Sequence, residues 1–108
     1  MKAGIFDIDG TLIREENGAE QVVEPLRNLA SLAYHSEDIK VIVLTARSEE
    51  VRDKTEKLLQ DNEIQYDRLY MRGNKDMNKP DYLFKKKKLD ELRWEGFESA
   101  SLWKIEEK

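Results

Sequence analysis

The chain has 108 residues, a length that suits one domain and is too short for two. Charged residues make up 39% of it, but their signs nearly cancel to a formal net charge of −4, which excludes a general polyanion-binding surface. The absence of cysteine excludes a disulfide framework and a thiolate zinc site, and the lack of a long apolar stretch excludes a signal peptide and a membrane span. We therefore expect a single cytoplasmic domain over residues 1–108.

The first half of the chain predicts two buried strands with a helix between them. Residues 2–8 form an apolar run that stops at an acidic, glycine-containing turn at 9–11, as expected for a buried strand that ends in a loop. A helix is expected over 25–35, because proline suits its first turn and apolar residues follow at helical spacing. Residues 39–45 are apolar and rich in β-branched side chains, which predicts a central strand.

The second half continues this alternation of strands and helices. We expect a helix capped by Ser48 and ending near residue 62, a strand over 66–71, a helix over 80–92 and a last strand over 97–105. Such alternation implies right-handed crossovers and a parallel sheet with helices on both faces. The expected fold is therefore a small Rossmann-like α/β domain.

Sites in sheets of this kind form where the carboxyl ends of the strands meet. The rule selects a set of polar residues that follow the predicted strands, and these are Asp7, Asp9, Thr45, Arg47, Met71, Arg72, Glu106 and Glu107. We therefore expect one site at this edge of the sheet.

The most informative pair in this set is Asp7 and Asp9, followed by Gly10 and Thr11. In phosphoryl transfer one carboxylate can attack phosphorus while a second protonates the leaving oxygen and later activates water. A divalent cation held by carboxylates, typically Mg²⁺, offsets the repulsion between the two anions. By itself the Asp-x-Asp-Gly pattern is weak, and an acidic turn or a fragment of a calcium loop explains it about as well.

The context of this motif narrows the alternatives. Asp-Ile-Asp-Gly-Thr at 7–11 follows one apolar strand, and Leu-Thr-Ala-Arg at 44–47 follows a second, and this combination closely resembles the first two motifs of the haloacid-dehalogenase (HAD) superfamily. Within that superfamily, the stretches 41–47, 51–55 and 66–72 look most like the phosphatase domain of phage polynucleotide kinase and related nucleic-acid 3′-phosphatases. The resemblance covers nearly the whole chain.

The resemblance assigns roles to the residues that match the family motifs. It implies that Asp7 is the nucleophile, that Asp9 is the general acid and base, and that Thr45 and Arg47 contact the phosphate together with Thr11. Arg72 matches an arginine that follows the third strand in the family.

The third family motif resembles the stretch from Asp81 to Lys85. The family has an aspartate four residues before its phosphate-binding lysine, so the resemblance singles out Lys85 from the run Lys85–Lys88. The spacing also places Asp81 and Lys85 on one helical face, where the carboxylate can orient the ammonium.

The chain departs from the family pattern at two places. Glu106 and Glu107 stand where the family has paired aspartates, and the extra methylene of each can move a metal ligand by about 1 Å. These glutamates are therefore either metal ligands alongside Asp7 and Asp9 or ordinary charged residues of a domain shortened at its C-terminus. Gly18 stands where the related phosphatases carry an arginine, for which Arg14 is a possible substitute.

Two functions from different classes follow. The first is magnesium-dependent hydrolysis of a phosphomonoester through an aspartyl-phosphate, on a nucleic-acid 3′-phosphate or a nucleotide. Only about a dozen residues separate the first strand from the first helix, so the domain is expected to be capless and open to large substrates. The second is a catalytically weak or inactive binding or assembly module that forms a homodimer through an exposed sheet edge.

Overall fold

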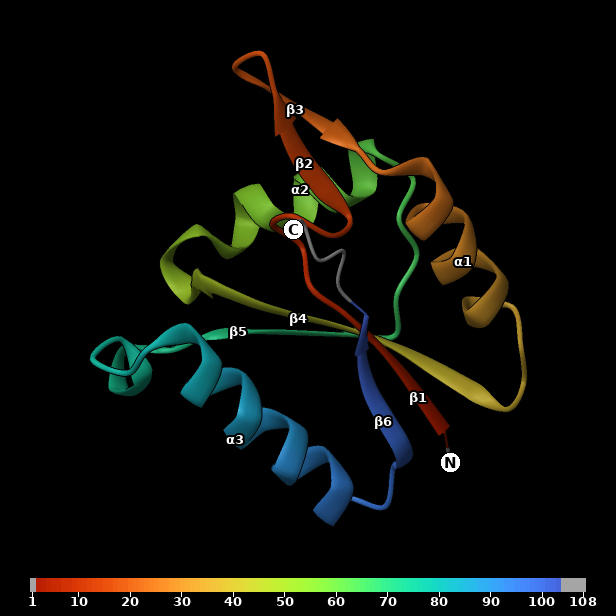
Figure 1. Ribbon diagram of the computed structural model, residues 1–108, viewed down its shortest axis with the longest axis vertical. Coiled ribbons are helices and arrows are strands. Elements are labelled where there is room, and N and C mark those ends of the chain that lie inside the picture. The colour runs from red at the N-terminus through yellow and green to blue at the C-terminus, as the bar shows by residue number, and fades with distance from the viewer. Residues whose placement is uncertain (1, 104–108) are drawn as a thin grey trace.

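The computed structural model describes residues 2–103, with side chains described up to Phe97, and its centre is a parallel sheet (Figure 1). The four strands run in the order β5-β4-β1-β6, and all neighbours are parallel. Their bounds are β1 (Lys2–Phe6), β4 (Ile39–Ser48), β5 (Arg68–Arg72) and β6 (Glu98–Trp103). The predicted Rossmann-like α/β fold is confirmed.

Helices cover both faces of this sheet because its inner strands are apolar on both sides. Helices α1 (Glu24–Tyr34) and α2 (Arg52–Asp61) pack on one face, and α3 (Asp81–Trp94) packs on the other (Figure 1). Successive residues of a strand point to opposite faces, so Val41 and Val43 of β4 belong to the core under α1 and α2, whereas Ile42 and Leu44 belong to the core under α3. No helix in the described part of the chain is both long and apolar enough to cross a membrane.

A two-stranded hairpin fills the segment between β1 and α1, and the sequence analysis did not predict it. Strands β2 (Ile13–Glu16) and β3 (Ala19–Val22) pair in antiparallel fashion around Asn17 and Gly18, which both have positive φ. A two-residue Asn-Gly turn with positive φ is the favoured hairpin connection, so this dipeptide was the available signal. The expected absence of a cap domain in this segment agrees with the short hairpin found there.

The hairpin also explains why a glycine stands at position 18, where the related phosphatases carry an arginine. Its φ is 79°, a conformation that glycine adopts freely and that strains other residues. Arg14, the suggested substitute, lies on β2 and pairs with Glu16 of the same strand at 3.9 Å. The role of Arg14 as a substitute for that arginine stays a prediction.

Several element ends differ from the predictions, and hydrogen bonds explain two of them. The hydroxyl of Ser48 accepts from the N–H of Glu50, so it caps a short 3₁₀ helix, η1 (Glu49–Val51), that precedes α2. Strand β5 begins at residue 68 because Asp67 bonds Val41 through both its side chain and its N–H, at 2.7 and 2.8 Å. A second 3₁₀ helix, η2 (Asn74–Asp76), lies in the loop after β5.

The core under α3 gives a test of this packing. Phe84 is 1% exposed on the inner side of α3, so Phe84→Ala should lower the free energy of unfolding by about 3–5 kcal/mol in urea denaturation. Trp94, on the same helix, is 91% exposed, and Trp94→Ala should change it by no more than about 0.5 kcal/mol. Equal effects of the two substitutions would contradict the placement of α3.

Candidate active site

Asp7 lies buried just past the carboxyl end of β1, and a lysine of α3 binds its carboxylate. Its side chain is 3% exposed, its Oδ1 accepts from the N–H of Ile8 at 2.8 Å, and its Oδ2 accepts from Lys85 Nζ at 2.6 Å. Lys85 belongs to α3 and is itself largely buried. A buried carboxylate requires such a partner, because an unpaired charge in the interior is costly.

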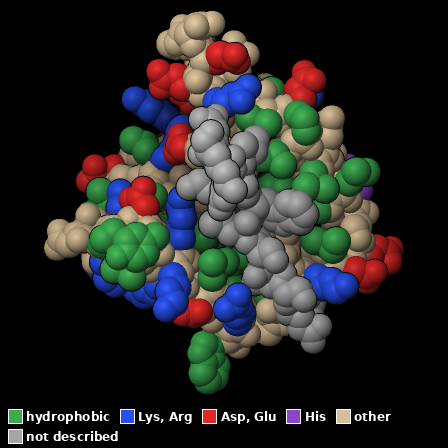
Figure 2. Space-filling view, in the orientation of Figure 1, with side chains coloured by type: hydrophobic (Ala, Val, Ile, Leu, Met, Phe, Trp, Pro, Cys, Tyr) green, Lys and Arg blue, Asp and Glu red, His purple; other side chains and the backbone are tan. Residues whose placement is uncertain are grey.

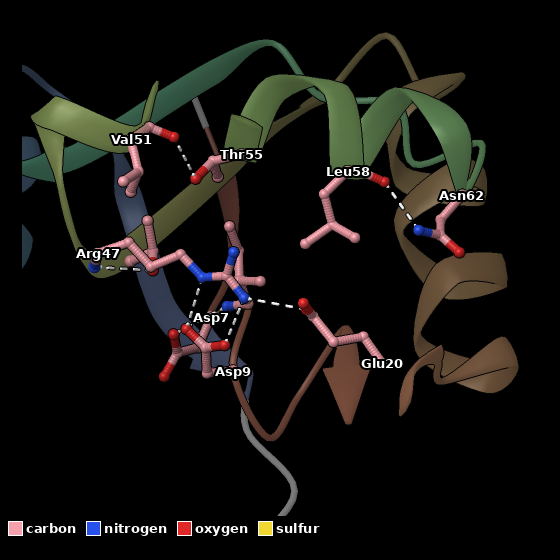
Figure 3. Close-up of polar contacts among 10 residues, drawn as sticks. Asp7, Asp9, Glu20, Arg47, Val51, Thr55, Leu58 and Asn62 are labelled. Carbon is pink, nitrogen blue, oxygen red and sulfur yellow. Dashed lines mark hydrogen bonds and ion pairs between the residues drawn. The ribbon is translucent and has the colours of Figure 1, made fainter. Parts of the chain in front are cut away.

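Asp9 forms a second ion pair at the same edge, with Arg47 at the end of β4. Arg47 Nε and Nη2 lie 3.0 and 2.7 Å from the two Asp9 oxygens, and Nη2 also lies 3.3 Å from Glu20 Oε2 on β3 (Figure 3). The hydrogen bonds with Asp9 raise the pKa of Arg47 above its ordinary value, against the opposing effect of burial. The carboxylates of Asp7, Asp9 and Glu20 and two cations therefore meet where β1 and β4 end.

The turn after β1 explains why Asp7 and Asp9 can share one site. Gly10 has a φ of 79°, and its N–H bonds the carbonyl of Ile13 at 2.8 Å while the N–H of Thr11 bonds the carbonyl of Ile8. This turn buries Thr11 completely, and its hydroxyl has no hydrogen-bond partner within the described residues. The hydroxyl is therefore free to donate a hydrogen bond, and its role in phosphate binding stays a prediction.

Thr45 is the second predicted hydroxyl, and it is also fully buried. Its Oγ1 accepts from the N–H of Arg47 at 3.2 Å, which ties the hydroxyl to the segment that carries the guanidinium. A hydroxyl that accepts one hydrogen bond can still donate another. Thr45 and Arg47 are thus positioned together by the end of β4.

Arg72 and Asp81 pair with each other at the neighbouring strand end. Arg72 Nη1 lies 3.0 Å from Asp81 Oδ1 and 3.2 Å from the carbonyl oxygen of Lys79, and its Nε is buried without a partner among residues 2–97. Asp81 therefore binds Arg72 instead of orienting Lys85, and that expected pairing is wrong. Asp81 stands at the exposed start of α3, whereas Lys85, one turn later, reaches inward to Asp7.

Asp76 is a buried acidic residue that the sequence analysis missed. It is 4% exposed in η2, and its Oδ1 lies 3.2 Å from Lys79 Nζ and 3.4 Å from Lys87 Nζ. Burial by itself raises the pKa of Asp76, but the hydrogen bonds from the two lysines outweigh it, so the pKa lies below its ordinary value of 3.8. No motif marked this residue, because Lys87 becomes its neighbour only when the loop folds onto α3, and Lys79 alone gives no signal of burial.

The lysine run of α3 does not act as one basic patch. Lys85 binds Asp7, Lys87 binds Asp76, and Lys88 lies 3.0 Å from Glu91 and 5.0 Å from the centre of the Tyr70 ring. On the face shown in Figure 2, basic and acidic side chains stand side by side over the surface. This intermixing agrees with the near cancellation of charge along the chain.

The donor set at the strand ends fits a magnesium ion. Mg²⁺ is commonly held by one or two carboxylates with waters and substrate phosphate oxygens completing its shell, and Asp7 and Asp9 supply two carboxylates. The described residues include no group of three or more His, Cys, Asp or Glu side chains close enough to hold a metal by themselves. Glu106 and Glu107 lie outside the described residues, so their role as ligands stays a prediction.

A comparison with protein families matches this chain over most of its length. The family described as the polynucleotide kinase PNKP phosphatase domain matches residues 1–92, which include every site residue placed above. The chain belongs to this family. A comparison with curated proteins finds no match.

Two solved structures support the assignment of this PNKP-like phosphatase domain. A chain in "Structure of the Pnkp1/Rnl/Hen1 RNA repair complex" aligns with a TM-score of 0.73 and 30% identity over 83% of this chain and 31% of its own length. A chain in "Structure of Pnkp1/Rnl/Hen1 complex" aligns with a TM-score of 0.73 and 25% identity over 96% of this chain and 45% of its own. The present chain thus spans less than half the length of either.

The Asp76 cluster predicts a dependence of stability on pH. Because the folded pKa of Asp76 lies below 3.8, its ion pairs stabilise the fold fully above that value, and this contribution disappears as the pH falls through the folded pKa. Asp76→Asn should therefore lower the free energy of unfolding at neutral pH, and the difference from the parent protein should shrink in acid. Urea denaturation across this range measures it.

Asp90→Asn is the matched control for this experiment. Asp90 is an exposed carboxylate of α3 that lies 3.8 Å from Arg93, and exposed pairs of this kind contribute little. An Asp76→Asn variant no less stable than Asp90→Asn at neutral pH would contradict the structural role of Asp76.

Proposed function

We propose that this domain is a magnesium-dependent phosphatase that removes a terminal phosphate from nucleic acid through an aspartyl-phosphate intermediate. The observation that carries the proposal is the buried Asp7–Lys85 ion pair beside the Asp9–Arg47 pair at the carboxyl edge of the sheet. It joins a candidate nucleophile, a candidate proton donor and two cations for phosphate oxygens in one place. The family assignment supports phosphatase chemistry on nucleic-acid ends.

Asp7 is the proposed nucleophile. One of its carboxylate oxygens forms a bond to phosphorus as the ester bond to the leaving oxygen breaks, which leaves the phosphoryl group on Asp7. The N–H of Ile8 and the ammonium of Lys85 hold the carboxylate in a single orientation, so little freedom is lost when it attacks. Lys85 also offsets the negative charge that attacker and phosphate bring together.

Asp9 is the proposed general acid and then the general base. It gives a proton to the leaving alkoxide, and it later takes a proton from the water that attacks the aspartyl-phosphate and releases inorganic phosphate from Asp7. Arg47 Nε and Nη2 hold the Asp9 side chain in place in the free protein. Substrate phosphate is the natural competitor for this guanidinium, because planar guanidinium groups bind phosphate through two hydrogen bonds.

Asp7 and Asp9 would hold the magnesium ion, which, when bound, polarises a phosphate oxygen and shields the attacking carboxylate from the charge of its target. The family resemblance and the two carboxylates support this cofactor. Thr11 and Thr45 supply hydroxyl donors for the remaining phosphate oxygens, and both are held rigidly by burial. The described residues thus offer two hydroxyls, from Thr11 and Thr45, and two cations, Lys85 and Arg47, for the phosphate oxygens.

A terminal phosphate on a polynucleotide is the substrate that this open site supports best. Only the β2–β3 hairpin stands between β1 and α1, so a long chain can approach the carboxylates. We take the group to be a 3′-phosphate, with a free nucleotide as the alternative substrate, and the cytoplasm as the location. The RNA repair complex named for one structural neighbour agrees with a nucleic-acid substrate.

Removing the nucleophile tests the mechanism. Asp7→Asn should lower magnesium-dependent phosphate release from a 3′-phosphorylated oligonucleotide by at least about 10³-fold, because asparagine cannot form the phosphoenzyme. Asp9→Asn should lower it by about 10²–10⁴-fold through loss of the proton donor. Asp90→Asn makes the same chemical change at an exposed position and should leave the rate unchanged. A folded Asp7→Asn variant with full activity rules out this mechanism.

A second candidate function is an assembly module with weak or no catalysis. Two observations favour it: the two solved structures named above are of multi-protein complexes, and β5 and β6 are the edge strands of the sheet that residues 2–103 form. An unpaired edge can add a strand from another chain, including a second copy of this one.

Light scattering behind size-exclusion chromatography tests this candidate. A homodimer should appear as twice the monomer mass at high protein concentration and should dissociate on dilution. A constant monomer mass across the concentration range would rule out self-association and leave only assembly with a different protein.

A further inference from the structure

A groove lies between the hairpin and α2, and one of its lining residues is Arg47, which binds Asp9. Its volume is about 560 Å³, within the range of about 300–1,000 Å³ that ligand sites commonly have. The lining residues come from β3, the end of β4, η1 and α2, and they are Glu20, Arg47, Val51, Lys54, Thr55, Lys57, Leu58 and Asp61. Arg47, Glu20, Thr55 and Leu58 are seen around this space in Figure 3.

Arg47 connects the groove to the candidate active site. Arg47 lines the groove, and its Nη2 lies 2.7 Å from Asp9 Oδ1 and 3.3 Å from Glu20 Oε2. A phosphate held at Asp7 and Asp9 would therefore carry whatever is attached to it directly past Arg47 and into the groove. The groove is thus placed for the part of the substrate next to the scissile phosphate.

The α2 wall of the groove is apolar along one helical stripe. Val51, Thr55 and Leu58 are spaced at i, i+4 and i+7, which places them on the same face of the helix. The hydroxyl of Thr55 donates a hydrogen bond to the carbonyl oxygen of Val51 at 2.9 Å, so it has no free donor for a ligand. This wall suits a flat group that hydrogen-bonds little through its faces, such as a nucleobase.

A single unengaged cation borders that apolar stripe. Lys57 pairs with Asp61 at 3.4 Å and Arg47 pairs with Asp9 and Glu20, whereas the ammonium of Lys54 has no ion-pair partner among residues 2–97. Lys54 is exposed on the first part of α2. In a chain with a net charge of −4, a free lysine beside an apolar groove marks a local site for an anion.

We propose that this groove binds the 3′-terminal nucleoside of an unpaired strand, with its base against Val51 and Leu58 and the next backbone phosphate on Lys54. The proposal rests on the phosphatase function proposed above and adds the part of the substrate that is recognised beside the phosphate. The base must be free of a duplex to enter, as in other proteins that read single strands. The groove therefore selects single-stranded ends over free inorganic or aryl phosphates.

Binding measured in the Asp7→Asn protein tests the proposal without turnover. Fluorescence anisotropy of a labelled, 3′-phosphorylated single-stranded oligonucleotide, titrated at several salt concentrations, gives both affinity and its salt dependence. Adding Lys54→Gln should weaken binding several-fold at low salt and reduce the slope of log K against log salt by about 0.7, the value for one phosphate contact on a single strand. Lys2→Gln removes the same charge at the start of β1, the opposite end of the strand from Asp7, and should change neither quantity.

The apolar wall is tested by a substitution that leaves charge unaltered. Val51 is the N-cap residue of α2, a position where asparagine is favourable, so Val51→Asn should fold normally. It should weaken binding several-fold with the salt slope unchanged. An oligonucleotide with an abasic 3′-terminal residue should bind the Asp7→Asn protein and its Val51→Asn derivative with the same, weakened affinity. The abasic end and the substitution remove the same contact, that between the base and Val51.

The outcomes separate this proposal from the phosphatase function. If the protein with Asp7 intact hydrolyses the oligonucleotide but the Lys54 and Val51 substitutions leave binding unchanged, the groove assignment is wrong and the phosphatase function stands. Additive losses from Val51→Asn and the abasic end would also overturn the assignment. If the Asp7→Asn protein does not bind the oligonucleotide and the protein with Asp7 intact does not hydrolyse it, both proposals fail.

Discussion

The site depends on the buried ion pair between Asp7 and Lys85. The two residues are 78 positions apart, and their charged atoms lie 2.6 Å apart only because α3 packs across the sheet from β1 to its carboxyl edge. Leaving either charge buried without the other would cost about 3–5 kcal/mol. The packing of Phe84 and Leu92 under α3 and the chemistry of Asp7 are therefore linked, since the same helix supplies both the core and the ammonium.

The second constraint is the balance of charge around Asp9. Each carboxylate of the pair has its own cation, Lys85 for Asp7 and Arg47 for Asp9, and Glu20 from the hairpin competes for Arg47. A phosphate entering this site meets two cations that carboxylates hold in place, and it competes with Asp9 for Arg47. The same arrangement places Arg47 between the reacting groups and the groove along α2, so phosphate recognition and recognition of the adjoining nucleoside share one side chain.

The comparison of sequence and structure is most instructive where the two differ. The alternation of apolar strands and amphipathic helices was enough to predict β1, α1, β4, α2, β5 and α3, because each has its own periodicity. The hairpin was not predicted because its strands are short and its one strong signal, Asn17-Gly18, lies between charged residues that are typical of a loop. The burial of Asp76 was not predicted because it depends on ion pairs with Lys79 and Lys87. An acidic residue in a lysine-rich segment ordinarily faces solvent.

The sequence by itself determined the α/β fold, the edge of the sheet where polar residues gather, and the family, because strand periodicity, turn glycines and short motifs are local properties of the chain. Only the tertiary structure decided which cation meets which carboxylate. Asp81 could have met Lys85 by helical spacing, yet it pairs with Arg72 while Lys85 turns inward to Asp7. Pairings of this kind, and the groove between the hairpin and α2, depend on distances between elements far apart in the chain, which no local pattern encodes.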